Sequence, residues 1–169
     1  MNDATGSTIR EIPPTYLPMM IAVLGEYDIL EGDVAVMAGW IDVESAWNPW
    51  AVRYEPAFYE RYTEPLDFSE TEERTRALSW GLLQIMGQVA REFGFTDTYL
   101  PALCDPLVNL SLAAKILKNR HATTNSWIGA LAAYNGGLGG NFHRPYRNQF
   151  YVDKVLESAR SYGYQQGIS

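Results

Sequence analysis

The stretch MAGWIDVESAWNPWAVRYEP, residues 37–56, decides how the fold is interpreted. Apolar residues recur there, and just before it, at the spacing of one helix face: Val34, Met37, Ala38 and Ile41. The next position on that face is Glu44, and Asn48-Pro49 follows as a stop signal. Burial would raise the pKa of this carboxyl, and a carboxyl still protonated near neutral pH suits a general acid. The alternative is a helix-end Glu that is exposed or paired with Arg53.

Composition narrows the classes of protein to consider. The 169 residues are 47% hydrophobic and 13% aromatic, enough for one globular domain, and we predict a flexible lead-in over 1–14 and a single domain over 15–169. The net charge of −7, without a Lys/Arg stripe, argues against nucleic acid as a partner. No apolar run approaches the roughly 18 residues of a spanning helix, so membrane insertion is not expected. No obligate protein partner is evident, and the single Cys104 indicates a small buried residue.

Helical spacing and capping residues predict a mainly α chain of six to eight helices. Their expected ranges are 16–29, 34–45, 69–78, 87–93, 105–119, 126–134 and 149–162. Because no two-residue alternation of useful length occurs, no strand is predicted. Residues 48–68 are expected to be irregular, and SWGLLQIM at 79–86 is expected to form a compact apolar turn.

Two later stretches also hold polar side chains in apolar surroundings. In SWGLLQIM, the amide of Gln84 needs a partner or costs about 1–3 kcal/mol, and that partner is either a ligand or the core of the turn. In ALAAYNGG at 130–137, Tyr134 and Asn135 come at a helix end. The Tyr134 hydroxyl could orient a carboxylate, and the alternative is an ordinary helix end with a buried Tyr.

Taken in order, these motifs resemble the catalytic domain of the soluble lytic transglycosylases. The matching pieces are ES at 44–45, GLLQIM at 81–86, AYNGG at 133–137 and YVDKVL at 151–156. The resemblance spans about residues 30–160. It implies a lysozyme-like α-helical fold with a cleft for a glycan strand, peptidoglycan as the partner, and no metal or cofactor.

The resemblance also implies roles for individual residues. Glu44 would be the single catalytic acid/base, with Ser45 a supporting hydroxyl beside it. Gln84 would bind an N-acetyl or hydroxyl group of the substrate. Tyr134 would donate a hydrogen bond to Glu44, and Asn135 would line the sugar groove.

The remaining candidates have smaller roles. Leu83 stands where the family commonly has Met, a volume-conserving exchange, and the resemblance counts Leu83 and Tyr151 among the substrate-binding residues. Asp42, two residues before Glu44, falls on another helix face and is interpreted as a solvated or capping residue. His121 and His143 are expected at the surface or in loops, because no zinc-ligand spacing surrounds them.

The spacing from Glu44 to Gly81 departs from the family, because it is longer than the compact family pattern. The extra segment, residues 53–78, could form a lid that carries stacking aromatics: Tyr54, Phe58, Tyr59 and Tyr62. It also supplies acidic residues, any of which could position a water: Glu55, Glu60, Glu64 and Asp67. A positioned water would make the enzyme a hydrolytic muramidase, as in the related goose-type lysozymes.

The favoured prediction is a lytic transglycosylase that cuts the MurNAc–GlcNAc bond and leaves a 1,6-anhydro-MurNAc end. The alternatives are the hydrolytic muramidase, a non-catalytic peptidoglycan-binding domain, and an unrelated helical interaction protein. The first residues lack the pattern of a Sec signal peptide. We therefore expect a bacteriophage protein, either an endolysin released from the host cytoplasm at lysis or a component of the virion.

Overall fold

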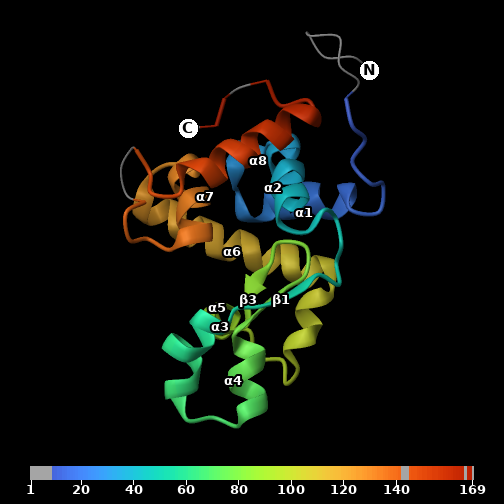
Figure 1. Ribbon diagram of the computed structural model, residues 1–169. Coiled ribbons are helices and arrows are strands. Elements are labelled where there is room, and N and C mark those ends of the chain that lie inside the picture. Colours follow the sequence, from blue (N-terminus) through green and yellow to red (C-terminus); the bar gives the residue numbers. More distant parts are fainter. Residues whose placement is uncertain (1–8, 142–144, 166, 169) are drawn as a thin grey trace. The chain divides into compact units, whose positions relative to one another are not determined.

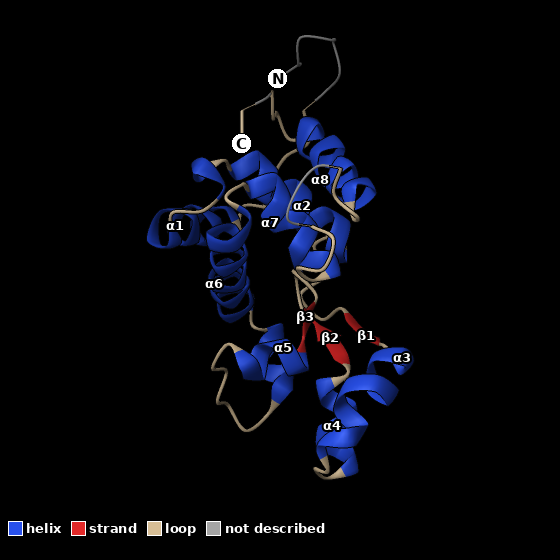
Figure 2. Cartoon of the chain, turned by 90° about the vertical axis from the view of Figure 1, so that its left-hand side faces the viewer, coloured by secondary structure: helices blue, strands red, loops and turns tan. Residues whose placement is uncertain are grey.

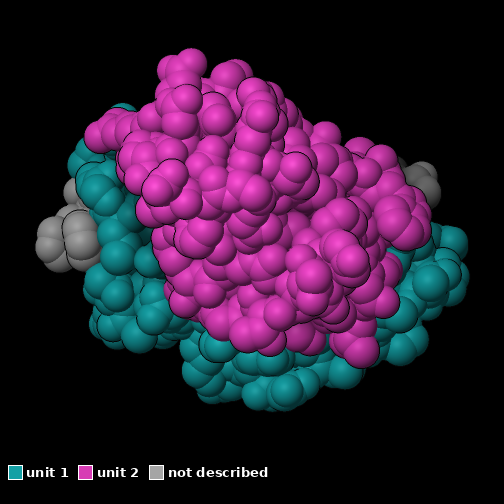
Figure 3. Space-filling view, turned by 90° about the horizontal axis from the view of Figure 1, so that it is seen from below, with its two compact units in different colours: residues 1–43, 114–169 teal, residues 44–113 magenta. Residues whose placement is uncertain are grey.

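The computed structural model describes residues 9–141, 145–165, 167 and 168 (Figure 1). It divides into two compact units: residues 1–43 with 114–169 form unit 1, and residues 44–113 form unit 2 (Figure 3). Much of the predicted lead-in, residues 1–8, lies outside the described residues, as does His143. The single domain over 15–169 stays a prediction.

Helices dominate both units, which confirms the mainly α class (Figures 1 and 2). Their bounds are α1 Leu17–Tyr27, α2 Val34–Ser45, α3 Pro56–Phe58, α4 Glu70–Arg76, α5 Gly87–Glu92, α6 Pro106–Thr124, α7 Trp127–Gly136 and α8 Gln149–Ser161. Ser69 and Ser126 cap the starts of α4 and α7, because Ser69 accepts a hydrogen bond from the Glu72 N–H at 3.3 Å and Ser126 from the Gly129 N–H at 3.2 Å. The end predicted for α6 was five residues short, because the helix continues past its last apolar position.

Unit 1 is a helical core in which α7 is the most buried element. Every side chain from Trp127 to Ala133 is buried, whereas α8 buries one face. Helices α2 and α8 approach closely at Gly39, where an added Cβ would lie 2.5 Å from the Ala159 nitrogen and 2.6 Å from the Val155 oxygen. Only a residue without a side chain permits this contact, so Gly39 fixes how α8 lies on α2.

Asp42 joins three parts of unit 1. Its carboxylate accepts hydrogen bonds from Arg10 and from Ser158, each at 2.7 Å. Burial alone would raise the pKa of Asp42, but the hydrogen bonds from Arg10 and Ser158 outweigh it and hold the pKa below its ordinary value. Asp42 is therefore a half-buried ionised link, and the interpretation as a solvated or capping residue was wrong.

Unit 2 contains a small antiparallel sheet that the sequence analysis did not predict. Its strands are β1 Val52–Tyr54, β2 Leu78–Trp80 and β3 Ile85–Met86, in the order β1-β2-β3. Val52 pairs with Trp80, which in turn pairs with Ile85. Strands this short cannot display a two-residue alternation, and all of β1 is exposed. The expected compact turn at 79–86 is therefore the greater part of a β-hairpin.

Besides this sheet and helices such as α4 and α5, unit 2 contains several short helical turns. The stretch predicted to be irregular contains β1 and α3, then a π-helical turn at Tyr59–Thr63 and a 3-10 turn at Glu64–Leu66. A further 3-10 turn, Leu100–Cys104, precedes α6 and buries Cys104, as the sequence indicated. Burial raises the pKa of the Cys104 thiol, which keeps it protonated.

Candidate active site

Glu44 lies in the last turn of α2. The helix begins after Asp33, whose carboxylate accepts a hydrogen bond from the Val36 N–H at 2.9 Å. Side chains are buried from Val36 to Ile41, whereas Glu44 and Ser45 are half-buried. Glu44 is therefore only partly buried as a residue, less than its position on the apolar face suggested.

The chain turns sharply directly after this helix. Ala46 and Trp47 both adopt left-handed backbone conformations, with φ of 49° and 66°, and the Asn48 N–H donates to the Ser45 carbonyl at 3.1 Å. Each left-handed residue other than glycine costs roughly 1 kcal/mol or more, so such a turn persists only where the surrounding structure holds it. It ends α2 at Ser45, three residues before the predicted stop signal at Asn48.

Arg53 and Asp42, two charged residues near Glu44 in the sequence, form their ion pairs with residues other than Glu44. The Arg53 Nε lies 2.6 Å from the Glu55 Oε1, so Arg53 forms its ion pair within β1 and the residue after it. Asp42 is bound to Arg10. Asp42, with its lowered pKa, is a poor proton donor. The role of Glu44 as the acid of this helix end stays a prediction.

Gln84 closes the loop of the β2–β3 hairpin. Its Oε1 accepts a hydrogen bond from the Ser79 hydroxyl at 3.0 Å, and its Nε2 donates to the carbonyls of Ala51 at 3.0 Å and Gly81 at 2.9 Å. The partners that the amide requires are thus found within unit 2. These bonds tie the hairpin loop to the segment before β1. Substrate binding by Gln84 stays a prediction.

Asn109, in α6, holds the same loop from the other side. Its Oδ1 accepts from the Leu83 N–H at 2.8 Å, and its Nδ2 donates to the carbonyls of Trp80 at 2.9 Å and Leu103 at 2.8 Å. Gly81, at φ 73°, lies directly against it, and a Cβ there would collide with the Asn109 amide. Sequence reasoning missed Asn109; the available signal was an Asn among the apolar residues of the predicted helix, and the structure buries it fully.

Leu83 lies in the interior of unit 2. Its side chain is 0% exposed, so its observed place is in the core below the hairpin loop. A contact between Leu83 and substrate stays a prediction.

Tyr134 lies near the end of α7 and is half-buried. Its ring meets the fully buried Trp40 edge-to-face, with centroids 4.7 Å apart and an interplanar angle of 87°. This contact fixes the ring against α2. The predicted hydrogen bond from Tyr134 to Glu44 would join residues of different units and stays a prediction.

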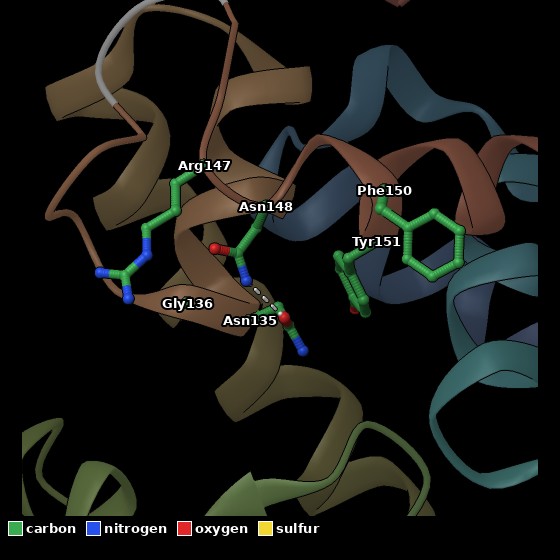
Figure 4. Close-up of a pocket in the computed structure, with 6 residues that line it drawn as sticks. All are labelled: Asn135, Gly136, Arg147, Asn148, Phe150 and Tyr151. Carbon is green, nitrogen blue, oxygen red and sulfur yellow. Dashed lines mark hydrogen bonds between the residues drawn. The ribbon is translucent and has the colours of Figure 1, made fainter.

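A pocket of about 460 Å³ opens in unit 1 where α7 ends and α8 begins (Figure 4). Its lining consists of Asn135, Gly136, Arg147, Asn148, Phe150 and Tyr151. The Asn148 Nδ2 donates to the Asn135 Oδ1 at 2.7 Å. In Figure 4 this amide pair lies between Arg147 and Tyr151, and the Asn135 nitrogen points away from Asn148. The pocket therefore brings together two predicted site residues, Asn135 and Tyr151.

The amide pair depends on a glycine. A Cβ on Gly136 would collide with the side-chain amide of Asn148, so the absence of a side chain makes room for the bond between Asn148 and Asn135. Asn148 precedes α8 as its N-cap, yet its side chain makes no capping hydrogen bond. Arg147 and Asn148 were not predicted, because no periodic pattern in the sequence links them to the end of α7.

Each unit thus carries part of the predicted set. Glu44, Ser45, Leu83 and Gln84 belong to unit 2, and Tyr134, Asn135 and Tyr151 belong to unit 1. A comparison with models of protein families matches residues 30–153 to the transglycosylase SLT domain. The chain belongs to this family. No curated protein and no solved structure matches it.

Membership of the SLT family settles the coarse questions. The lysozyme-like α-helical fold class is confirmed, as is the soluble lytic transglycosylase relationship. The SLT domain is a transglycosylase domain that acts on peptidoglycan, so the unrelated interaction protein is excluded.

The segment 53–78 of this SLT domain is more ordered than predicted. Its aromatic rings pack in pairs, with centroids 6.2 Å apart for Tyr54 and Tyr59 and 4.8 Å apart for Phe58 and Tyr62. Its acids Glu60, Glu64 and Asp67 are exposed. A lid or a water-positioning function for the segment stays a prediction.

Among the described residues, no three His, Cys, Asp or Glu side chains are grouped so that they could hold a metal ion. None of the helices described has both the length and the apolar character needed to cross a bilayer.

Proposed function

We propose that this SLT domain cuts peptidoglycan between MurNAc and GlcNAc without consuming water, with Glu44 as the single acid/base. The observation that carries the proposal is the different surroundings of two acidic residues, Asp42 and Glu44, near the end of α2. There the neighbouring carboxylate, Asp42, is held ionised by Arg10 and Ser158, and Glu44 stands half-buried two residues later. Family membership supplies the substrate class.

The reaction needs only one protein carboxyl. Glu44 donates its proton to the glycosidic oxygen, the bond from MurNAc C1 to that oxygen breaks, and GlcNAc leaves with a new hydroxyl. The carbonyl oxygen of the substrate's own N-acetyl group stabilises the positive charge at C1. The Glu44 carboxylate then takes the proton of the MurNAc 6-hydroxyl, and O6 bonds to C1. This step forms the 1,6-anhydro ring and restores the protonated Glu44, so no second carboxyl is needed, in contrast to most glycosidases.

Hydrolysis is the second candidate, and the exposed acids of the 53–78 segment favour it. A carboxylate that holds a water beside C1 would give a reducing MurNAc end. Mass spectrometry of fragments released from purified Gram-negative peptidoglycan separates the two reactions. Fragments one water lighter, without a reducing end, support the proposal, and reducing MurNAc ends contradict it.

The variant Glu44→Gln tests the catalytic role. Loss of the acid/base should lower turnover by about a thousandfold or more, while binding to purified cell walls persists. Asp42→Asn is the matched control, because it removes a carboxylate from the same helix and should still lyse walls. A Glu44→Gln protein that retains full lysis would show that the acid lies elsewhere. A wild-type protein that binds walls but releases no fragments would leave the non-catalytic binding domain.

A further inference from the structure

Charge is distributed unevenly between the pocket of unit 1 and the chain as a whole. The chain has 20 acidic and 13 basic residues, yet the pocket lining carries one guanidinium, two carboxamides, two aromatic rings and no carboxylate. Lys154 adds a second cation beside the pocket, 4.6 Å from the centre of the Phe150 ring. This hollow is therefore locally positive on an acidic protein and suits a ligand that carries negative charge.

The backbone and stem of Arg147 are held in place. Its N–H donates to the Gly140 carbonyl at 2.9 Å. Gly140 has φ of 83°, and a Cβ there would lie 3.1 Å from the Arg147 Cβ and 3.3 Å from its Cδ. Gly140 therefore accommodates the aliphatic stem of Arg147 in a left-handed turn that favours glycine. The residue as a whole is exposed, which leaves the guanidinium accessible from the pocket.

Among the residues that the structure describes, the Arg147 guanidinium has no ion pair with an acidic side chain. Other arginines do form such pairs, among them Arg10, Arg53, Arg74, Arg76 and Arg91. A guanidinium presents a rigid fork that binds a carboxylate through two parallel hydrogen bonds. The two amides beside Arg147 supply additional polar contacts for the rest of such a ligand.

We propose that Arg147 binds a carboxylate carried by the muramic acid residues of the glycan strand. This inference rests on the proposed function, which makes that strand the substrate. The sugar backbone is neutral, and its negative charge comes from the 3-O-lactyl group of MurNAc or from the stem peptide attached to it. Arg147 is thus a specificity-determining residue that separates a muramic acid glycan from a chemically similar neutral glycan such as a chitin oligosaccharide.

The test measures binding in the Glu44→Gln background, so that no ligand is turned over. Three tetrasaccharides serve as probes in calorimetric titrations: peptidoglycan tetrasaccharide with stem peptides, the same compound after amidase has freed its lactyl carboxylates, and neutral chitotetraose. Arg147→Ala should reduce the preference for a carboxylate ligand over chitotetraose about tenfold. Arg147→Lys keeps the charge without the fork and should restore only part of that preference.

Arg160→Ala is the matched control, since Arg160 is an exposed arginine of α8 and its loss changes the net charge equally. It should leave the preference unchanged. If Arg147→Ala loses the preference for the amidase-treated ligand over chitotetraose, Arg147 binds the lactyl carboxylate. If it loses the preference for the peptide-bearing ligand instead, Arg147 binds a carboxylate of the stem peptide. An unchanged preference in Arg147→Ala, or an equal loss for all three ligands, overturns the inference. If the wild-type protein neither binds nor cuts any peptidoglycan ligand, the proposed function itself fails.

Discussion

The hairpin loop of unit 2 and the pocket of unit 1 are both organised by side-chain amides, but they use them differently. Gln84 and Asn109 direct both ends of their amides to internal partners. In the pocket, the Asn135 oxygen is fixed by Asn148, and its nitrogen points away from that bond (Figure 4). The first arrangement builds a loop, and the second leaves an amide nitrogen that the internal bond does not use, as binding of a ligand in this pocket would require. The same functional group in two family motifs thus has two physical roles.

The largest effect is expected at the centre of the hairpin network. Asn109→Leu, of similar volume, removes the bonds to Leu83, Trp80 and Leu103 and leaves three buried backbone groups without partners. The cost should be about 3 kcal/mol or more, a fall in melting temperature of roughly 10 °C. Differential scanning calorimetry measures it, with Asn119→Leu on the exposed part of α6 as the control. Equal melting temperatures for the two variants would contradict the structural role.

The next effect, at Gln84, distinguishes a structural role in the hairpin loop from a role in binding substrate. Gln84→Ala should cost about 2 kcal/mol in the free energy of unfolding, because bonds to Ser79, Ala51 and Gly81 are lost. Gln84→Gly should recover about 1 kcal/mol of this, since the residue has φ of 45°. If Gln84 is mainly a substrate ligand, both variants will instead keep their stability and raise KM. Urea unfolding together with initial rates on peptidoglycan distinguishes these results.

A smaller effect is expected at Asp42, which belongs to neither the loop nor the pocket. Its substitution measures how much one ion pair, that with Arg10, contributes to the stability of unit 1. Its folded pKa is lowered, so its contribution is present above the unfolded pKa of about 3.9 and is lost as pH falls through the folded value. Asp42→Asn should cost about 1 kcal/mol at pH 7, because Arg10 is half exposed and water screens part of the attraction. The melting temperatures of the wild-type protein and of Asp42→Asn should differ at pH 7, and this difference should shrink as the pH falls toward 3. A constant difference across this range would show that the link is not ionic.

Much of the helical framework follows from local chemistry. Helix α2 has the predicted bounds, Val34–Ser45, because Asp33 caps its start and the apolar period is regular. The family motifs also identified both regions compared above. The strands escaped prediction because two or three residues are too few for alternation to appear, and their pairing depends on Gln84 and Asn109, whose partners are distant in the sequence.

The pocket shows most clearly what sequence alone could not supply. Asn135 and Tyr151 were predicted from motifs, but the place where they meet depends on side-chain contacts of Asn141 and Asn148. Asn141 is fully buried, its Nδ2 donates to the Gly137 carbonyl at 2.8 Å, and its Oδ1 accepts from the Asn148 N–H at 3.0 Å. Hydrogen bonds made by a single side chain such as that of Asn141 follow no helical or strand periodicity, so the sequence pattern does not predict them.

The smallest change in stability, and the sharpest test of the comparison, is expected at Asn148. Because its side chain makes no capping bond, Asn148→Ala should alter the free energy of unfolding by less than about 0.5 kcal/mol. Affinity for chitotetraose in the Glu44→Gln background should nevertheless fall about fivefold, since the Asn135 amide is then free to rotate. This combination would identify Asn148 as a positioning residue.

Asn148→Asp separates positioning from packing. A carboxylate at this N-cap favours the first turn of α8, so stability should rise slightly. The same carboxylate only accepts hydrogen bonds, so it should bind the Asn135 nitrogen and turn the Asn135 oxygen toward the ligand. Stability and affinity should therefore change in opposite directions, a result that a purely structural residue would not give. If Asn148→Asp keeps the affinity of the parent protein, the orientation of Asn135 does not matter for binding, and the pocket amides are architectural like those of the hairpin.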